Sequence, residues 1–407
     1  MGAVETAIHS ERAALQRILG PLTLGAFFAE IWEKSPTLIR HAGAHAFDDI
    51  ITVAQLDAFL SRSDIRNPTL RMVRDGAELP LEEYTRELKL GAHVSRDLID
   101  NEKLFTLFQG GGTIVLQFLQ NNIASFGHFS NALENDLGCN VHGSCFITPP
   151  EAQGFTAHYD TYSFFVIQIR GTKRWKLYNR TALAPIREDR DSDFPWIACD
   201  PIQEYTLEAG DVLYVPRGYF HEAATTSDPS IHLTLGLFVP TWIDVIRAAL
   251  NDLYAVPEMR ENPSFCRTDG GYDVAEAELS AIRRVIGTRL DLRVGLERIS
   301  EQQRARRVDT RQNRLSDSLA APGIDALTAL CIQPLLSNLL SVTTTNDAIV
   351  LDFVDKRLRY PAYVEPSIRQ MLSRDRFTPL DVAGELDVDS CVTLCRQLLH
   401  EGFLTAQ

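Results

Sequence analysis

The sequence TPPEAQGFTAHYDTYSFFVIQIRGTKRW, residues 148–175, contains the most informative pattern in this chain. It places His158 and Asp160 two positions apart, directly before the apolar run 163–170. Residues two positions apart on a strand point to the same face, so both side chains can reach one ion. The stretch therefore predicts part of a metal site at the start of a strand.

A third candidate ligand, His221, follows the strand-like run 211–215 and a turn built on Pro216 and Gly218. Two imidazoles and one carboxylate form the facial triad of non-haem Fe(II) oxygenases, which leaves coordination positions open for other ligands. We therefore interpret the two histidines and Asp160 as an iron site.

A His-x-Asp pair is a weak indication by itself, because short motifs occur by chance. The chain contains a similar pair, His9-Ser-Glu11, in a polar helix-like stretch with no strand pattern beside it. The strand pattern after Asp160 and the glycine-containing turn before His221 favour a metal site over a chance match.

Short apolar runs separated by turn residues extend from residue 140 to residue 240. Strands at this spacing, without helices between them, are typical of an antiparallel sandwich or a small barrel. The predicted strands are 141–148, 164–169, 174–178, 211–215 and 231–238.

Helical patterns lie on both sides of this region. Apolar residues recur every three or four positions over 11–35, and Pro36 ends that pattern. The polar segment 301–318 and Pro322-Gly323 indicate a boundary. We therefore expect three parts: residues 1–240, 241–320 and 321–407. Further predicted helices are 53–62, 96–108, 242–250, 274–299 and 388–404, the last of which ends at Gly402.

The composition is that of a soluble globular protein with two or three domains: 407 residues, 45% hydrophobic and 23% charged. A net charge of −14 means that the surface as a whole repels nucleic acid, so any contact with nucleic acid would need a local basic patch. A run of arginines is the one basic candidate, and a solvated helix face is its favoured interpretation. These arginines are Arg304, Arg306, Arg307, Arg311 and Arg314.

The seven cysteines are scattered, odd in number and without a CxxC pair, which indicates reduced thiols. Cys391 and Cys395 lie four positions apart on a predicted helix, and we interpret them as core residues rather than zinc ligands. No apolar run reaches the length of a membrane span, and the N-terminus lacks a signal-peptide core. The expected location is the cytoplasm.

These residues resemble a known family. The stretch 148–160, with Gly171-Thr-Lys173-Arg-Trp175, is similar to the ribosomal oxygenases of the JmjC, or cupin-like, class, and so is Trp32-Glu-Lys-Ser-Pro36. The resemblance implies an α+β chain: a double-stranded β-helix (jelly-roll) barrel, N-terminal helices, a helical dimerisation region and a C-terminal winged-helix domain. It also implies an enzyme that uses Fe(II), 2-oxoglutarate and O₂ to hydroxylate an arginine or histidine of a ribosomal protein.

The resemblance assigns roles to individual residues. It gives His158, Asp160 and His221 to the iron, Lys173 to the far carboxylate of 2-oxoglutarate, and Thr234 and Ser144 to further contacts with the cosubstrate. A surface lysine and a plain strand threonine are the alternatives for Lys173 and Thr234.

This chain departs from the family at two positions. The family often has asparagine and tyrosine where this chain has Ser144 and Phe146, and phenylalanine has no hydroxyl to donate a hydrogen bond. Cosubstrate affinity and the substrate pocket are therefore expected to differ. Gln168, on the first barrel strand, either lines the pocket or lies in a buried polar network.

Other classes of function stay open. The first is a hydroxylase of a natural-product precursor peptide or of tRNA, and the acidic charge weighs against tRNA. The second is a cupin that does not use 2-oxoglutarate, against which Lys173 weighs. The third is a non-catalytic binding module, against which the three retained ligands weigh. The resemblance is to the hydroxylase branch and therefore implies a hydroxylated protein side chain, and not a demethylated lysine. The sequence also has no cysteine-histidine zinc cluster beside the barrel, which favours the same expectation.

Overall fold

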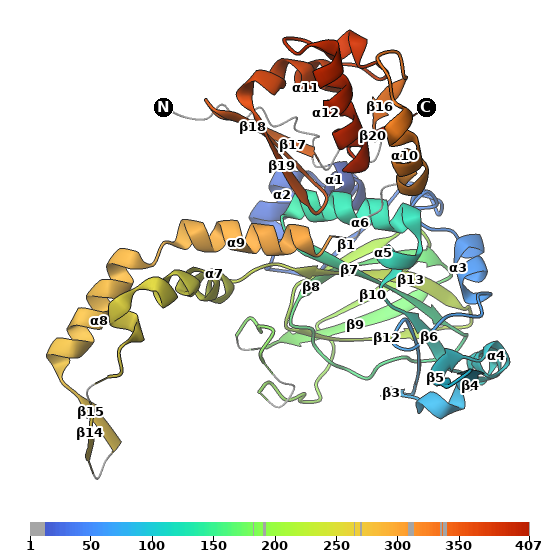
Figure 1. Cartoon of the computed structure of the whole chain (residues 1–407). Helices are drawn as coiled ribbons and strands as arrows, with labels where there is room; N and C mark the ends of the chain where they lie inside the picture. Colours follow the sequence, from blue (N-terminus) through green and yellow to red (C-terminus); the bar gives the residue numbers. More distant parts are fainter. Residues whose placement is uncertain are drawn as a thin grey trace. The chain divides into compact units, whose positions relative to one another are not determined.

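Two antiparallel sheets form the centre of the N-terminal part of the chain. The larger sheet has the strand order β1-β11-β8-β13-β7-β6-β2-β3, and the smaller has the order β10-β9-β12 (Figure 1). The five predicted strands are confirmed as β7, β8, β9, β11 and β13. The strands are β1 (Thr37–Ile39), β2 (Leu70–Arg74), β3 (Ala77–Glu78), β6 (Thr113–Leu116), β7 (Asn140–Thr148), β8 (Ser163–Arg170), β9 (Lys173–Arg180), β10 (Gln203–Leu207), β11 (Val212–Val215), β12 (Tyr219–Thr225) and β13 (Ser230–Phe238).

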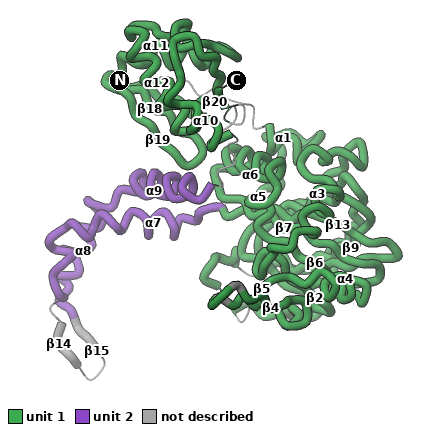
Figure 2. Tube along the Cα trace, turned by 45° about the vertical axis from the view of Figure 1, so that its right-hand side comes forward, with its two compact units in different colours: residues 1–238, 308–407 green, residues 239–307 purple. Residues whose placement is uncertain are grey.

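This computed structural model describes residues 13–181, 183–189, 193–263, 265–268, 271–307, 313–333, 336 and 340–406. The chain divides into two compact units, one of residues 1–238 and 308–407 and one of residues 239–307 (Figure 2). His9, Glu11, Arg311 and the side chain of Cys266 lie outside the described residues.

The apolar run of β8 is buried on both faces, which explains why it does not alternate with polar residues. Phe164 and Val166 pack in one core cluster with Trp175 of the smaller sheet. Phe165 and Ile167 point to the opposite face, where they join the core formed with the N-terminal helices. Successive strand residues face opposite sides, so β8 contributes to two cores at once.

The N-terminal helices pack on the larger sheet and contribute to the same core. A π-helix, η1, follows α2 and ends at Ile31. The helical stretch therefore ends before Pro36, as predicted. The helices here are α1 (Ala13–Leu19), α2 (Leu24–Ala26), η1 (Phe27–Ile31), α3 (Val53–Leu60), η2 (Leu81–Glu83), α4 (Asn101–Gln109), α5 (Leu119–Asn122) and α6 (Ala124–Leu137).

The helix predicted over 96–108 is wrong in its first part. Residues up to Ile99 belong to β5 (His93–Ile99), which pairs with β4 (Thr85–Leu90). The helix begins only after Asp100, whose carboxylate accepts from the backbone N–H groups of Glu102 and Lys103. Asp at this position caps a helix start, and this local signal sets the boundary.

The second unit is mainly helical. Its helix α7 packs against α9, and Gly295 of α9 permits the close approach, because an added Cβ would lie 2.4 Å from the Val245 carbonyl oxygen. Its elements are α7 (Trp242–Leu250), η3 (Asn251–Ala255), η4 (Pro257–Arg260), β14 (Phe265–Thr268), β15 (Gly271–Val274), α8 (Glu276–Arg289) and α9 (Leu292–Ala305).

The C-terminal residues have a core of their own. It includes Cys391 and Cys395, as predicted from their spacing. Helix α12 ends at His400, two residues before the predicted end at Gly402, which takes a left-handed φ of 73° before the chain enters β20. The elements are α10 (Arg314–Ala320), η5 (Ala321–Gly323), β16 (Leu330–Ile332), β17 (Leu340–Thr344), β18 (Ala348–Phe353), β19 (Lys356–Pro361), η7 (Ala362–Val364), α11 (Glu365–Leu372), η8 (Leu380–Val382), α12 (Val388–His400) and β20 (Leu404–Ala406).

The helical middle region ends earlier than expected. Its unit stops at Arg307, whereas the sequence suggested 320. Helix α10 belongs with the C-terminal core instead, because the buried Asp317 accepts hydrogen bonds from the Thr405 hydroxyl and the Ala406 N–H, both at 3.0 Å. The arginine run is therefore split between two elements, since Arg304 lies on α9 and Arg314 on α10.

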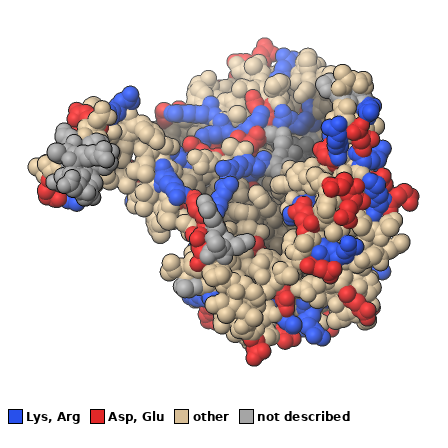
Figure 3. Space-filling view, turned by 90° about the horizontal axis from the view of Figure 1, so that it is seen from below, with Lys and Arg blue, Asp and Glu red and all other residues tan. Residues whose placement is uncertain are grey.

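Acidic and basic side chains lie side by side on the face of the molecule drawn in Figure 3, where both signs are interspersed among the described residues. Among the helices that the structure describes, none is both long enough and apolar enough to cross a bilayer.

Candidate metal centre

The two halves of the predicted metal site meet through a backbone bridge between His158 and His221. The N–H of His158 donates to the carbonyl of His221 at 3.1 Å, and the reverse bond is 2.8 Å. His221 lies on β12, whereas His158 and Asp160 precede β8 in a segment without a regular strand. The prediction that His158 and Asp160 lie on one strand is therefore wrong, and pairing with β12 is what brings the ligands together.

The three side chains converge on one point. Their ligand atoms all lie within 4.8 Å of one another, and His221 Nε2 is 3.7 Å from Asp160 Oδ2. The Nδ1 atom of His158 contacts the Thr156 carbonyl at 2.7 Å, and that of His221 contacts the Tyr219 carbonyl at 3.0 Å. Since a carbonyl only accepts, each Nδ1 carries the proton and each Nε2 keeps a lone pair for a metal.

The surroundings hold these ligands in a metal-binding form. Burial, together with the nearby His158, lowers the pKa of His221 to about 3, so the ring is neutral at ordinary pH. The Asp160 carboxylate has a partner that sequence reasoning missed: it raises the pKa of the Tyr162 hydroxyl, which hydrogen-bonds to it. Partners of this kind orient a metal ligand.

A cavity of about 430 Å³ lies beside the ligands. Side chains of both sheets line it, and it brings together all the site residues predicted from the sequence: His158, Asp160, His221, Lys173, Thr234 and Ser144. Phe146 also lines the cavity, and Ser144 is the cross-strand partner of Thr234.

Gln168 belongs to a buried network and not to the cavity wall. Its side-chain amide donates to the Arg170 carbonyl and to the Ser230 hydroxyl, both at 2.8 Å. It is fully buried and is not among the described residues that line the cavity. Of the two interpretations open from sequence, the structure supports the network.

Lys173 places a buried amino group inside the cavity wall. The residue is 3% exposed, and its Nζ donates to the Thr148 hydroxyl at 3.0 Å. Among the described residues, no carboxylate lies within ion-pair distance of Nζ. Burial lowers the pKa of Lys173 to about 7, because an ammonium ion without a counter-ion is costly in a dry site. An anionic ligand would satisfy it.

Two further polar side chains of the cavity were missed from the sequence. Trp175 Nε1 and His232 Nδ1 are both buried without a hydrogen-bond partner in the described part of the chain. Both line the cavity, and the His232 ring stacks on Phe146 with ring centroids 4.8 Å apart. Strand alternation could have found them, because Trp175 is two residues from Lys173 and His232 two residues from Thr234.

The donor set fits a metal ion together with a small carboxylate-bearing ligand. Two imidazoles and a carboxylate suit a divalent transition metal and leave positions open for other ligands. Within the described part of the chain, the buried Lys173 has no counter-ion, and the buried Trp175 Nε1 and His232 Nδ1 atoms have no hydrogen-bond partner. These groups suit a carboxylate at the end of the ligand away from the metal.

Comparison with known proteins agrees with this geometry. A family model described as the JmjC domain matches residues 117–245. The chain is 29% identical over 238 residues to the bifunctional lysine-specific demethylase and histidyl-hydroxylase NO66 of Drosophila persimilis, which covers 58% of this chain and 33% of that protein. It is 28% identical over 259 residues to human ribosomal oxygenase 1, covering 61% and 38%. The matched region spans only about a third of these relatives.

Solved structures extend the likeness to nearly the whole chain. The Escherichia coli ribosomal oxygenase YcfD matches with a TM-score of 0.54 at 15% identity, over 95% of this chain and 98% of that one. A structure of YcfD in complex with cobalt and 2-oxoglutarate matches with a TM-score of 0.53 at 14% identity, over 95% and 99%. At these identities the likeness concerns the fold, and it confirms the JmjC, or cupin, fold expected from the sequence.

Proposed function

Because this chain carries a JmjC domain similar to that of the ribosomal oxygenases, we propose that it is an Fe(II)- and 2-oxoglutarate-dependent oxygenase that hydroxylates a side chain of a protein or peptide. The observation that carries the proposal is the convergence of His158, Asp160 and His221 within 4.8 Å beside the buried Lys173, which has no carboxylate partner among the described residues. Neither the three candidate metal ligands alone nor Lys173 alone would distinguish this chemistry from that of other metal-binding cupins.

Each part of the site has a defined task in this proposal. His158, Asp160 and His221 would hold iron through two Nε2 atoms and a carboxylate oxygen. Iron with 2-oxoglutarate and O₂ supplies the oxidising power, and the reaction converts a C–H bond to C–OH and yields succinate and CO₂. Lys173 would pair with the far carboxylate of 2-oxoglutarate. The hydroxyl groups of Thr234 and Ser144 lie across the β7–β13 pair from each other and would contact the same cosubstrate.

The apolar residues around these groups keep water from the reacting centre. Phe164 is 1% exposed and Trp175 is 5% exposed, and both contact the His221 ring, with centroids 5.0 and 5.9 Å from it. Excluding water strengthens the electrostatic attraction between Lys173 and a bound carboxylate. It also protects a reactive oxidant from side reactions.

We propose that the product is a hydroxylated arginine or histidine side chain and that the substrate is a ribosomal protein. The names of the relatives include both hydroxylase and demethylase activities, and no zinc cluster accompanies the barrel in this sequence. The Phe146 and Ser144 departures change the cavity wall, so a precursor peptide is the alternative substrate.

The product can be identified by mass spectrometry. Iron-loaded protein is incubated with 2-oxoglutarate and O₂ in the presence of ribosomal proteins, precursor peptides or a cell lysate, and the peptides are mapped. We expect a stable gain of one oxygen atom on an arginine or histidine, absent when 2-oxoglutarate is omitted. Release of formaldehyde with loss of a methyl group from lysine would contradict the hydroxylase proposal.

We also propose a homodimer formed through α7 and α9. Helix α7 buries Val245 and Ala248 inside its own unit, yet leaves Trp242 67% exposed and Ile246 41% exposed one helical turn apart. On α9, Leu296 is 47% exposed. Large apolar surfaces on a helix are typical of a partner interface.

Light scattering tests the dimer. At micromolar concentration we expect twice the monomer mass of 45.6 kDa for the native protein. The double substitution Trp242→Glu and Ile246→Glu should give the monomer mass, because it places charge on the apolar face, whereas Leu315→Glu, on the exposed face of α10, should leave the dimer intact. A native protein at the monomer mass would contradict the proposal.

Two further assignments complete the proposal. The α-helices α10, α11 and α12 and the three-stranded sheet β17–β18–β19, all among the described residues after 312, support a winged-helix domain. The described cysteines form no disulfide, which supports a reducing compartment such as the cytoplasm.

A further inference from the structure

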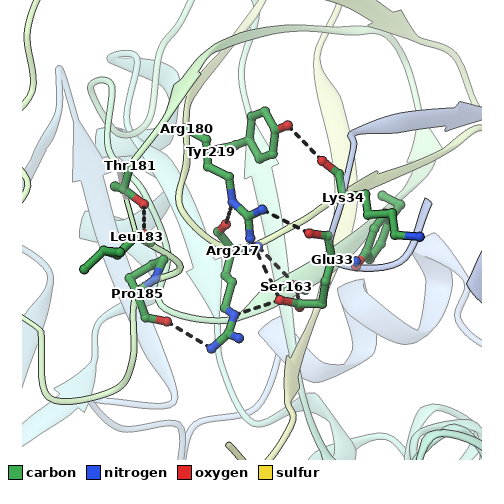
Figure 4. Close-up of polar contacts among 10 residues, drawn as sticks. Glu33, Lys34, Ser163, Arg180, Thr181, Leu183, Pro185, Arg217 and Tyr219 are labelled. Atoms are coloured by element: carbon green, nitrogen blue, oxygen red, sulfur yellow. Dashed lines mark hydrogen bonds and ion pairs between the residues drawn. The ribbon is translucent and has the colours of Figure 1, made fainter. Parts of the chain in front are cut away.

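Glu33 ties the N-terminal segment to both segments that carry the metal ligands (Figure 4). Its carboxylate accepts from the Ser163 hydroxyl at 2.5 Å and from Arg217 Nε at 2.8 Å. Its backbone carbonyl accepts from Arg180 Nη1 at 3.0 Å. Glu33 itself has a left-handed φ of 57°, which a non-glycine residue keeps only when its surroundings hold it there.

Arg217 is held at four of its groups (Figure 4). Besides the bond from Nε to Glu33, its Nη1 donates to the Pro185 carbonyl at 3.1 Å and its backbone N–H donates to the Ser163 hydroxyl at 3.1 Å. Its carbonyl accepts from Arg180 Nε at 3.0 Å. Arg217 therefore anchors the turn between β11 and β12 at four points.

The anchored turn leads directly to the metal ligands. The residue after Arg217 is Gly218, whose N–H donates to the Asp160 carbonyl at 3.0 Å. His221 follows three residues later, and Ser163 lies three residues after Asp160. Gly218 has a φ of 84°, and a Cβ there would lie 2.5 Å from the Thr181 hydroxyl, so the turn has little room to shift on that side.

We propose that Glu33 is a positioning residue: through Arg217 and Ser163 it sets the separation between the Asp160 carboxylate and the His221 imidazole, and thereby the metal affinity. Asp160 lies outside the regular strands: its carbonyl is held by the bond from Gly218 and its carboxylate by the Tyr162 hydroxyl, and Ser163 follows three residues later at the start of β8. The Glu33 and Arg217 side chains are 28% and 23% exposed, so their charge-assisted bonds are partly shielded from water. This inference rests on the metal ligands of the proposed function, but it concerns a residue outside the cavity.

The test is a Co(II) titration of the full-length protein, followed through the d–d absorption bands of the metal. Glu33→Gln keeps the size of the side chain but removes its charge and places an amide against Arg217. We expect Co(II) to bind about 10-fold more weakly, the lower end of the loss seen when outer partners of metal ligands are removed, and we expect the d–d bands to shift. Arg217→Lys keeps the cation but loses the bond to Pro185, and should weaken binding in the same direction.

Glu401→Gln is the matched control. It breaks the Lys356–Glu401 ion pair of the C-terminal core, whose side chains are 25% and 26% exposed, close to the values for Arg217 and Glu33. It should lower the melting temperature about as much as Glu33→Gln, yet leave Co(II) affinity and spectrum unchanged. This comparison separates positioning of the metal site from a general loss of stability.

The outcomes distinguish this inference from the proposed function. Native-like Co(II) affinity and d–d bands in a folded Glu33→Gln variant would overturn the positioning role and leave the metal site intact. If Glu33→Gln does not fold, Arg217→Lys decides by the same two measurements. A native protein that binds no Co(II) would overturn the metal site itself and this inference with it.

Discussion

The His221→Ala variant is expected to lose metal binding and turnover together. His221 supplies one of three ligand atoms, and its Nε2 is already directed at the site because Nδ1 is held by the Tyr219 carbonyl. Loss of an outer partner alone typically weakens metal binding 10- to 100-fold, so loss of a ligand should cost more than about 100-fold. Calorimetric titration with Fe(II) under anaerobic conditions, or with Mn(II), measures the affinity.

An exposed histidine provides the control for this variant. His45 lies at the surface, where its imidazole contacts Asp48, and it is remote in sequence from the site. His45→Ala should bind metal and convert 2-oxoglutarate as the native protein does. Undiminished metal affinity in His221→Ala would show that the ligand set is wrong, and the oxygenase proposal would then lose its main support.

Lys173→Ala should weaken 2-oxoglutarate binding by about 10-fold or more, with little change in metal affinity. A charge-assisted hydrogen bond in a site of this kind contributes that much. In this chain Phe146 carries no hydroxyl, so in the proposed site Lys173 would contribute a larger share of the binding of the far carboxylate. The dissociation constant is measured with metal-loaded protein in the absence of O₂, through the absorption band that develops when 2-oxoglutarate binds Fe(II).

The pH dependence of this binding gives a second readout. The pKa of Lys173 is about 7 in the ligand-free protein, so the amino group is charged below that pH and increasingly neutral above it. A bound carboxylate favours the charged form, so binding above the pKa must take up a proton. We therefore expect 2-oxoglutarate to bind more weakly as pH rises through about 7, and Lys173→Ala to lose this dependence.

Arg174→Ala is the control for Lys173→Ala. Arg174 is the next residue of β9, is exposed, and lies on the opposite face of the strand. Its removal takes one cation from the same strand without touching the cavity, so 2-oxoglutarate affinity should not change. An unchanged affinity in Lys173→Ala would mean that another residue binds the carboxylate.

Local patterns were enough to predict the strands of the sheet core and to select the candidate site residues, which the structure places around one cavity. The patterns that predict β7, β8, β9, β11 and β13 each lie within fewer than ten residues, because the run or the alternation of apolar side chains that marks a buried strand is local. The pair His158 and Asp160 is equally local. The cavity brings these residues together with His221 and Lys173, as the spacing suggested.

Elements with weak local patterns were missed or misread. Strand β12, which carries His221, has the sequence YFHEAAT, and its place depends on pairing with β9. Residues 96–99 have the composition of a helix start but pair with β4 as part of β5. In both cases a partner strand distant along the chain overrides a weak local preference.

The sequence by itself determined which residues are candidates for binding metal and cosubstrate and which strands build the sheet around them. Only the tertiary structure decided how they meet: the His158–His221 bridge joins segments far apart in the chain, and Glu33 reaches Ser163 across 130 positions. It also decided that Lys173 is buried without a carboxylate partner among the described residues, and that Trp175 and His232 keep unpaired nitrogens beside it. Such features depend on contacts between distant segments and on exclusion of water, and neither is a property of any short stretch of sequence.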